Sequence, residues 1–205
     1  FRSLGRVKKM VLGRGVRSLI VANADDTHAP YFSSFHADTV ITYGISAQAT
    51  QQATNITHSR DGVSFVLGET HFALSVLGEF NVLNALPAII VARDLGVGED
   101  AIVKGLKDLK VIPGRMELIH AGQPFTVIVD YAHEKVSMRG ALTVARELAG
   151  AAHRVIAIVG AEGGGRDTDK RTHIGEIVAE LSDTVIVSNV DPYDDDPEKI
   201  IADIV

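Results

Sequence analysis

A glycine-rich stretch followed by an arginine is the first part of this sequence that could bind an anion. Residues 160–167 read Gly-Ala-Glu-Gly-Gly-Gly-Arg-Asp and lie between an apolar run and a segment of helical spacing. Backbone N–H groups before a helix attract anions, and the Arg166 guanidinium offers a planar fork for a carboxylate or a phosphate. The spacing is neither that of a Walker A loop nor Gly-x-Gly-x-x-Gly, so a flexible connection is an equally good interpretation.

A cluster of carboxylates follows the next apolar run. Residues 189–197 read Asn-Val-Asp-Pro-Tyr-Asp-Asp-Asp-Pro. Because the carboxyl ends of parallel strands meet at one sheet edge, this segment should face the glycine-rich stretch. Its carboxylates would favour a cationic group or Mg²⁺, and Asp191 is the preferred candidate for such a contact. Asp195 and Asp196 are interpreted as residues of a solvated loop, in which Asp196 caps a helix that starts at Pro197.

A carboxylate and an imidazole close a third apolar run, in the sequence Asp130-Tyr131-Ala132-His133. His133 is the candidate catalytic residue, although a histidine at the end of a strand is more often a local hydrogen-bonding residue. Arg115 and Glu117, after a Pro-Gly pair, could form an exposed ion pair of little energetic value. The other histidines lack the spacing of metal ligands, so no metal-ligating residue is assigned.

The composition is that of an ordinary globular chain and argues against several functions. The chain has 205 residues, 46% of them hydrophobic and 22% charged, which is enough for one large or two modest domains. A net charge of −6 without a basic cluster makes nucleic acid an unexpected partner. Without cysteine there is neither a disulfide nor a thiolate nucleophile. No apolar run approaches the ~20 residues that span a bilayer, so we expect no membrane partner and a cytoplasmic location.

The pattern of apolar residues predicts an α/β fold in two parts, divided at Pro113-Gly114. In the first part, a buried strand indicates a mostly parallel sheet, alternating residues indicate a small antiparallel sheet, and two helices follow. In the second part, a hairpin leads into strictly alternating helices and strands, the βαβ winding of a parallel sheet. The predicted ranges are 19–23 (strand), 53–77 (hairpins), 81–95 and 99–109 (helices), 116–120 and 125–130 (hairpin), 135–149 (helix), 154–160 (strand), 170–181 (helix), 184–188 (strand) and a helix from 197.

Four motifs, taken in order, resemble the signatures of the Mur ligases, which spend ATP to add one amino acid to the peptidoglycan precursor. They are Gly-Glu-Phe-Asn-Val-Leu-Asn-Ala (78–85), Pro-Gly-Arg-Met-Glu (113–117), Val-Asp-Tyr-Ala-His (129–133) and Gly-Gly-Gly-Arg-Asp-x-x-Lys-Arg (163–171). Within the family they are most similar to the members that add the third amino acid to UDP-N-acetylmuramoyl-L-alanyl-D-glutamate. The resemblance implies that residues 1–113 belong to the central ATP-binding domain. Residues 114–205 would be the first half of a Rossmann-like, amino-acid-binding C-terminal domain.

The resemblance also implies roles for single residues. Asn84 matches an asparagine near the adenine, Arg115 an arginine that reaches the phosphates, and Asp130 an acid at the nucleotide. Arg166 matches the arginine that holds the carboxylate of the incoming amino acid. ATP and Mg²⁺ are the implied cofactors, and the implied reaction passes through an acyl phosphate that the free amine of the amino acid attacks.

Two departures from the family pattern affect activity. The nucleotide-binding Gly-x-x-Gly-Lys-Thr loop is absent, so we expect this chain to be an internal fragment without ATPase activity of its own. The modified lysine that supports Mg²⁺ in many relatives aligns with Gly5, and Lys8 and Lys9 are out-of-register candidates.

A third departure concerns the amino acid that is added. Relatives that select meso-diaminopimelate show Asp-Asn-Pro-Arg, whereas here Asp191 stands at the asparagine position and Tyr193 at the arginine position. Because a second carboxylate facing Asp191 would be repelled, we expect a free amino acid with a cationic or neutral side chain, with lysine as the first candidate.

Two alternatives remain open at this point. The chain could belong to a related ligase that acts on another acceptor, of the folylpolyglutamate or cyanophycin synthetase type, although these usually lack the combination of the third and fourth motifs. It could also be a non-catalytic module that binds a nucleotide or an amino acid, which would agree with the absent phosphate loop.

Overall fold

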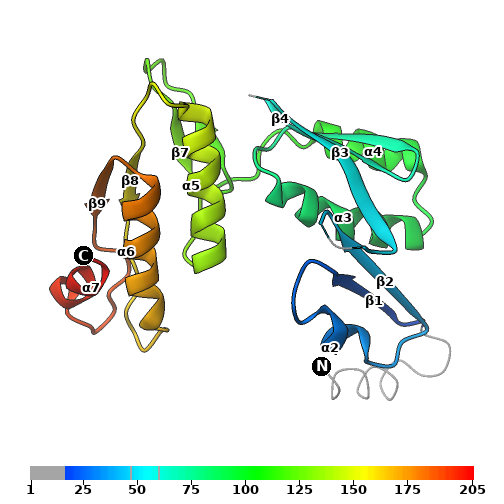
Figure 1. Ribbon diagram of the computed structural model, residues 1–205, viewed down its shortest axis with the longest axis horizontal. Helices are drawn as coiled ribbons and strands as arrows, with labels where there is room; N and C mark the ends of the chain where they lie inside the picture. The colour runs from blue at the N-terminus through cyan, green and yellow to red at the C-terminus, as the bar shows by residue number, and fades with distance from the viewer. Residues whose placement is uncertain (1–16, 47, 60) are drawn as a thin grey trace. The chain divides into compact units, whose positions relative to one another are not determined.

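A computed structural model describes residues 17–46, 48–59 and 61–205 of the chain. These residues form two compact units, divided between Lys110 and Val111 (Figure 1). Gly5, Lys8 and Lys9, on which the prediction about the Mg²⁺-supporting lysine rests, lie outside the described residues.

The first unit is built on one five-stranded sheet with the order β1-β2-β3-β4-β5. Its strands are β1 (Leu19–Asn23), β2 (Thr39–Gly44), β3 (Gln51–Ser59), β4 (Gly62–Leu67) and β5 (Thr70–Leu74). Strands β1, β2 and β3 pair in parallel, and β3, β4 and β5 pair antiparallel. Both predicted kinds of sheet are therefore present, and the long strand β3 joins them.

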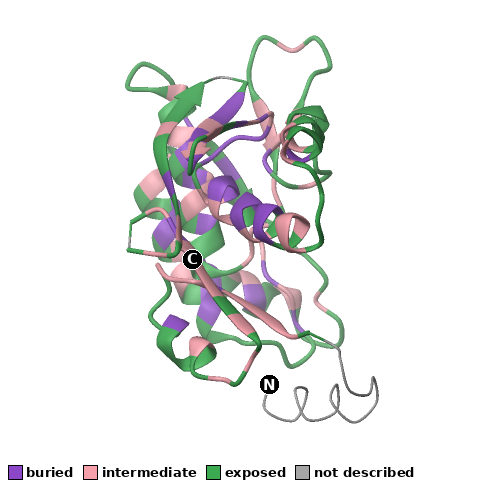
Figure 2. Cartoon of the chain, turned by 90° about the vertical axis from the view of Figure 1, so that its right-hand side faces the viewer, coloured by how far each residue is buried: buried purple, intermediate pink, exposed green. Residues whose placement is uncertain are grey.

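In the described part of this unit, three helices accompany the sheet: α2 (Ala29–Ser33), α3 (Phe80–Asp94) and α4 (Glu99–Asp108). Helix α3 contributes Val82, Leu86 and Ile89 to the core, all with exposed fractions of 0%. Phe65 and Phe72 stack beneath it with ring centroids 5.4 Å apart. Along single helices, buried residues alternate with exposed ones in Figure 2, as expected when one face of each helix packs on a core.

The second unit contains an antiparallel hairpin and a parallel strand pair with their helices. The elements are β6 (Glu117–Ile119), β7 (Val127–Val129), α5 (Lys135–Ala149), β8 (Ile156–Val159), α6 (Asp169–Leu181), β9 (Thr184–Val187) and α7 (Pro197–Ile204). Strands β6 and β7 pair antiparallel, and β8 and β9 pair in parallel. The core of this unit lies between the helices and β8, and Ile174, Ile177 and Val178 of α6 are at its centre.

Close helix packing in this unit depends on one glycine. A Cβ atom added to Gly175 of α6 would lie 1.9 Å from the carbonyl oxygen of Ile204 in α7. Only a glycine lets the backbones of these two helices approach so closely. Among the described residues, no helix is both long enough and apolar enough to cross a membrane.

Candidate functional site

The glycine loop, residues 160–167 between β8 and α6, is packed against the segment that follows β9. The N–H of Gly163 donates to the carbonyl oxygen of Asp191 at 3.0 Å. A Cβ atom on Gly160 would lie 2.4 Å from the carbonyl oxygen of Ser188, and one on Gly163 would lie 2.1 Å from that of Pro192. The glycines are therefore required by backbone contact, which the interpretation as a flexible connection did not include.

The acidic loop, residues 189–196, carries two residues with backbone angles that are rare for side-chain-bearing residues. The φ angle is 39° at Asp191 and 53° at Tyr193. Both side chains are exposed, and the Tyr193 ring lies where a Cβ atom on Gly164 would come within 2.9 Å of it. Such strained conformations persist only where the surroundings hold them, and here the glycine loop provides that support.

The two remaining acidic candidates have different outcomes. Asp196 is the N-cap of α7 and accepts from the N–H of Glu198 at 3.0 Å, so the predicted cap is confirmed. Asp195 is exposed, as interpreted, with 46% of its side chain accessible, but it also makes two contacts that were not predicted. Its Oδ2 accepts from the N–H of Gly164 at 3.1 Å and lies 3.7 Å from the Arg171 guanidinium. Sequence reasoning missed this because both partners are distant in the chain.

Arg166 stands at the end of the glycine loop, just before α6. Its side chain is exposed and makes no hydrogen bond or ion pair with any part of the chain that the structure describes. A guanidinium in this setting keeps all five N–H donors for a ligand. The two residues before it are glycines in the left-handed region, with φ angles of 68° at Gly164 and 74° at Gly165.

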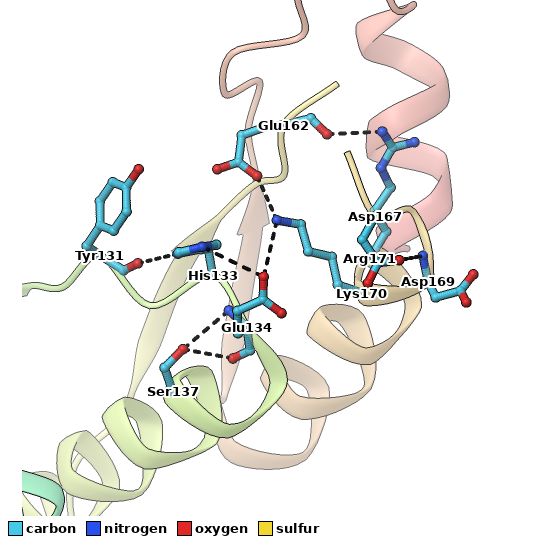
Figure 3. A network of polar contacts seen from close by, with 9 residues as sticks. All are labelled: Tyr131, His133, Glu134, Ser137, Glu162, Asp167, Asp169, Lys170 and Arg171. Atoms are coloured by element: carbon cyan, nitrogen blue, oxygen red, sulfur yellow. Dashed lines mark hydrogen bonds and ion pairs between the residues drawn. The ribbon is translucent and has the colours of Figure 1, made fainter. Parts of the chain in front are cut away.

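Two buried cations in the first turn of α6 join the loops of this unit (Figure 3). Lys170 is 6% exposed, and its Nζ lies 2.8 Å from Glu162 and 3.8 Å from Glu134. Its hydrogen bond to Glu162 is the main cause that lowers the pKa of that carboxyl from its ordinary value of 4.5. Glu134 is the N-cap of α5, so Lys170 connects the start of α5 with the glycine loop.

Arg171 makes a second set of contacts beside the first. It is 3% exposed and donates to the Asp203 carboxylate at 2.7 Å and to the carbonyl oxygen of Glu162 at 3.0 Å. Sequence reasoning did not single out Lys170 or Arg171. The available signal was two adjacent cations in a first helical turn, where the helix dipole disfavours positive charge unless carboxylates compensate it.

Asp130 holds two backbone segments together. One carboxylate oxygen accepts from the N–H of Met116 and the other from the N–H of Ala132, both at 2.7 Å. The N–H of Tyr131 donates to the carbonyl oxygen of Gly114 at 2.8 Å. These bonds fix the turn that bears Arg115 against the end of β7.

An exposed aromatic ring connects the arginine of this turn with the histidine. The Arg115 guanidinium lies 5.0 Å from the centroid of the Tyr131 ring. His133 packs edge-on to the same ring, and its Nδ1 lies 2.9 Å from the Tyr131 carbonyl oxygen. Glu117 accepts from the N–H of Gly114 at 2.8 Å, and the ion pair that Arg115 and Glu117 could have formed is not among the contacts of the described residues.

Asn84 belongs to the first unit and lies on the exposed side of α3. Its Nδ2 donates to Oδ1 of Asn81 at 3.0 Å, and the buried Asn81 in turn donates to the carbonyl oxygen of Leu77 at 2.7 Å. This chain of bonds orients the Asn84 amide and leaves its oxygen available as an acceptor.

In the second unit, the polar residues that are candidates for ligand binding follow the ends of β7, β8 and β9. Ligands of α/β proteins bind at such strand ends. Arg166 could bind an anion there, Asp191 could meet a cation, and His133 could accept a proton. In the described ranges, no three His, Cys, Asp or Glu side chains are grouped so that they could hold a metal ion.

Family models and known relatives match this chain. Residues 7–92 match a family described as "Mur ligase middle domain", and residues 114–205 match "Mur ligase, glutamate ligase domain". UDP-N-acetylmuramoyl-L-alanyl-D-glutamate--2,6-diaminopimelate ligase of Bacillus velezensis is 35% identical over 90% of this chain and 38% of its own length. UDP-N-acetylmuramyl-tripeptide synthetase of Roseiflexus sp. is 38% identical over 92% of this chain and 38% of its own length.

Solved structures show the same fold. That of UDP-N-acetylmuramoylalanyl-D-glutamyl-2,6-diaminopimelate--D-alanyl-D-alanyl ligase from Acinetobacter baumannii superposes with a TM-score of 0.69 at 22% identity. The match covers 93% of this chain and 41% of that structure. The chain thus spans about two fifths of the length of the proteins that it matches.

Proposed function

This chain belongs to the Mur ligase family, and we propose that it is part of an ATP-dependent ligase that adds the third amino acid to UDP-N-acetylmuramoyl-L-alanyl-D-glutamate. In this proposal residues 1–113 belong to the ATP-binding domain and residues 114–205 to the amino-acid-binding domain. The division between Lys110 and Val111 and the ranges of the two family models support this assignment. ATP as co-substrate makes the cytoplasm the expected location.

The observation that carries the proposal is the setting of Arg166. An exposed guanidinium without a protein partner in the described ranges, on a loop supported by glycines, is suited to the α-carboxylate of an incoming amino acid. Asp191 and Tyr193 lie on the neighbouring acidic loop, where the side chain of that amino acid would be selected.

The nucleotide would be bound by residues of both units. Asn84 presents an amide oxygen that could accept from the adenine amino group. Arg115 has no hydrogen bond from its guanidinium within the described part of the chain, so it could contact the phosphates. Asp130 would support nucleotide binding indirectly, by holding the turn that bears Arg115. Each of its carboxylate oxygens could still accept one more hydrogen bond, from the nucleotide itself. Mg²⁺ would accompany the ATP phosphates, and no residue described here is assigned to it.

The proposed ligation has two chemical steps. The D-glutamyl carboxylate attacks the γ-phosphorus of ATP, which forms an acyl phosphate and releases ADP. The amine of the amino acid then attacks the acyl carbon, the C–O bond to phosphate breaks, and inorganic phosphate leaves. His133 could take the proton that this amine loses, because an Nδ1–H that donates to the Tyr131 carbonyl leaves Nε2 as the acceptor. Nε2 lies 3.7 Å from a carboxylate oxygen of Glu134, which would stabilise the protonated imidazole.

The amino acid in this proposal has a cationic or neutral side chain, with lysine as the first candidate. The exposed Asp191 carboxylate would attract an ammonium group and repel a second carboxylate. The Bacillus velezensis relative is named for 2,6-diaminopimelate, whereas the name of the Roseiflexus relative specifies no amino acid. The names of the relatives therefore make meso-diaminopimelate the competitor to test.

The proposal is tested with the complete open-reading-frame product. Phosphate release is measured with ATP, Mg²⁺ and UDP-N-acetylmuramoyl-L-alanyl-D-glutamate, across amino acids that include lysine and meso-diaminopimelate. Stimulation by lysine is expected. Stimulation by meso-diaminopimelate alone would overturn the choice of amino acid but support the ligase, and no stimulation by any amino acid would overturn the proposed function.

A further inference from the structure

The glycine loop and the acidic loop are in close backbone contact. Gly160 and Gly163 approach the carbonyl oxygens of Ser188 and Pro192 so closely that a Cβ atom at either position would overlap them. The hydrogen bond from Gly163 to the Asp191 carbonyl adds a directional link. A shift of one loop toward the other is therefore blocked, and a shift away would break this hydrogen bond.

Asp195 provides the one side-chain link between these loops that also reaches a buried charge. Its Oδ2 accepts from the N–H of Gly164 at 3.1 Å and lies 3.7 Å from Nη2 of Arg171. Arg171 is 3% exposed and is fixed in addition by Asp203 and by the Glu162 carbonyl. The carboxylate of Asp195 is thus tied to a group that cannot easily move.

The residues that would select the amino acid lie on both sides of this link. Arg166 follows Gly164 by two positions on the glycine loop, and Asp191 and Tyr193 precede Asp195 on the acidic loop. Asp191 and Tyr193 hold φ angles of 39° and 53°. Aspartate tolerates this region better than most residues, whereas a bulky tyrosine adopts it only under constraint. The Tyr193 ring additionally rests on Gly164.

We propose that Asp195 is a positioning residue for amino-acid selection: by tying Gly164 to the buried Arg171, it sets the distance between the carboxylate-binding Arg166 and the side-chain-facing Asp191 and Tyr193. The proposal rests on the proposed function of the site. Asp195 itself touches no substrate in this account, and its effect is confined to the amino acid, because the nucleotide candidates lie on other segments.

The first test compares Asp195→Asn with Asp194→Asn in the complete enzyme. Both variants remove one carboxylate from the same loop, but Asp194 is exposed and makes no hydrogen bond or ion pair with the described residues. We expect Asp195→Asn to raise KM for the amino acid by about tenfold, because it removes the charge that faces Arg171 and weakens the hydrogen bond from Gly164, and to leave KM for ATP unchanged. Asp194→Asn should match the wild type in both constants.

The second test changes the glycine loop. Gly164 and Gly165 have similar positive φ angles, so an alanine is strained at either position, but only at Gly164 would its Cβ meet the Tyr193 ring. Gly164→Ala should therefore raise KM for the amino acid more than Gly165→Ala does. Equal effects of the two substitutions would contradict the coupling between the loops.

Hydrogen exchange provides a readout that does not depend on activity. The Gly163 and Gly164 amides should exchange faster in Asp195→Asn than in Asp194→Asn, with little change in α5. Equal exchange in the two variants would overturn the link. Asp195→Asn could instead raise KM for ATP, for the UDP-linked acceptor and for the amino acid alike, and also lower Tm. That result would show that Asp195 has a purely structural role, and it would overturn the proposal. A wild-type enzyme that responds to no amino acid would remove the proposed function, whereas the exchange comparison would still decide whether the link exists.

Discussion

At the scale of single residues, the contact between Arg115 and Tyr131 suggests that an exposed aromatic ring supports nucleotide binding. A cation over an exposed ring gains about 0.5–1 kcal/mol, which corresponds to a two- to fivefold change in affinity. Tyr131→Leu in the complete enzyme should therefore raise KM for ATP by about threefold with little change in kcat. Tyr131→Phe keeps the ring and should behave as the wild type. A normal KM for ATP in Tyr131→Leu would show that the Tyr131 ring does not support nucleotide binding.

Lys170 is a buried cation whose loss should lower stability, because it pairs with a carboxylate that is itself largely buried. Its removal would leave Glu162, with 14% of its side chain exposed, without a cation. We expect Lys170→Met to lower the free energy of unfolding by about 3 kcal/mol. Arg139→Met is the matched control, because Arg139 pairs with Glu180 at a surface where both side chains are about half exposed, and its loss should change stability only slightly. Urea unfolding of both variants at pH 7 makes the comparison.

The same pair predicts how stability depends on pH. Because folding lowers the pKa of Glu162 below its ordinary value of 4.5, the pair stabilises the protein fully above that value. Its contribution is lost as the pH falls from about 5 through the lowered pKa of the folded state. The free energy of unfolding should therefore fall less steeply between pH 5 and pH 3 in Lys170→Met than in the wild type. Parallel curves would contradict the assignment of this pair.

At the scale of elements, the packing of α6 on α7 can be tested with two glycines that sit inside helices. Gly175→Ala would place a Cβ atom 1.9 Å from the Ile204 carbonyl oxygen, so it should lower Tm by separating the helices. Gly105 in α4 has no atom within 4 Å of an added Cβ. Gly105→Ala should therefore stabilise the protein by about 0.5–1 kcal/mol through helix propensity. Thermal unfolding of the two variants should give shifts of opposite sign.

Most elements could be predicted from the sequence because their signals are local. Helix α5 has the predicted bounds, 135–149, since its apolar face repeats at helical spacing and Gly150 ends it. Strand β2 and the five-residue helix α2 were not predicted. Strand β2 shows no clean alternation of apolar and polar residues, so its place is recognised only from its pairing with β1 and β3.

The candidate site was predictable only in part, for a related reason. Arg166, Asp191 and His133 stand out by type at strand ends. The contacts of Asp195 depend on an amide and a guanidinium that lie 31 and 24 positions away in the chain, so only the fold reveals them. The same holds for Lys170, whose role depends on where Glu134 is placed.

At the scale of the whole molecule, the two units have separate cores in the described residues. Phe65→Ala in the first core should cost about 4 kcal/mol and speed hydrogen exchange in α3, while exchange in α6 stays unchanged. Ile174→Ala should do the reverse. If either variant speeds exchange in both units alike, the two cores unfold as one cooperative body.

The mutual fit of the glycine loop and the acidic loop also limits how such an enzyme can be re-engineered. If the acidic loop alone were transplanted from a relative with another amino-acid preference, its backbone would fit the glycine loop of that relative and not the one in this chain. The contacts of Gly160, Gly163 and Gly164 would then become clashes or gaps. A successful graft should carry residues 160–167 and 188–196 together with the cation at position 171, so the smallest exchangeable part of this site is a pair of loops and not a motif.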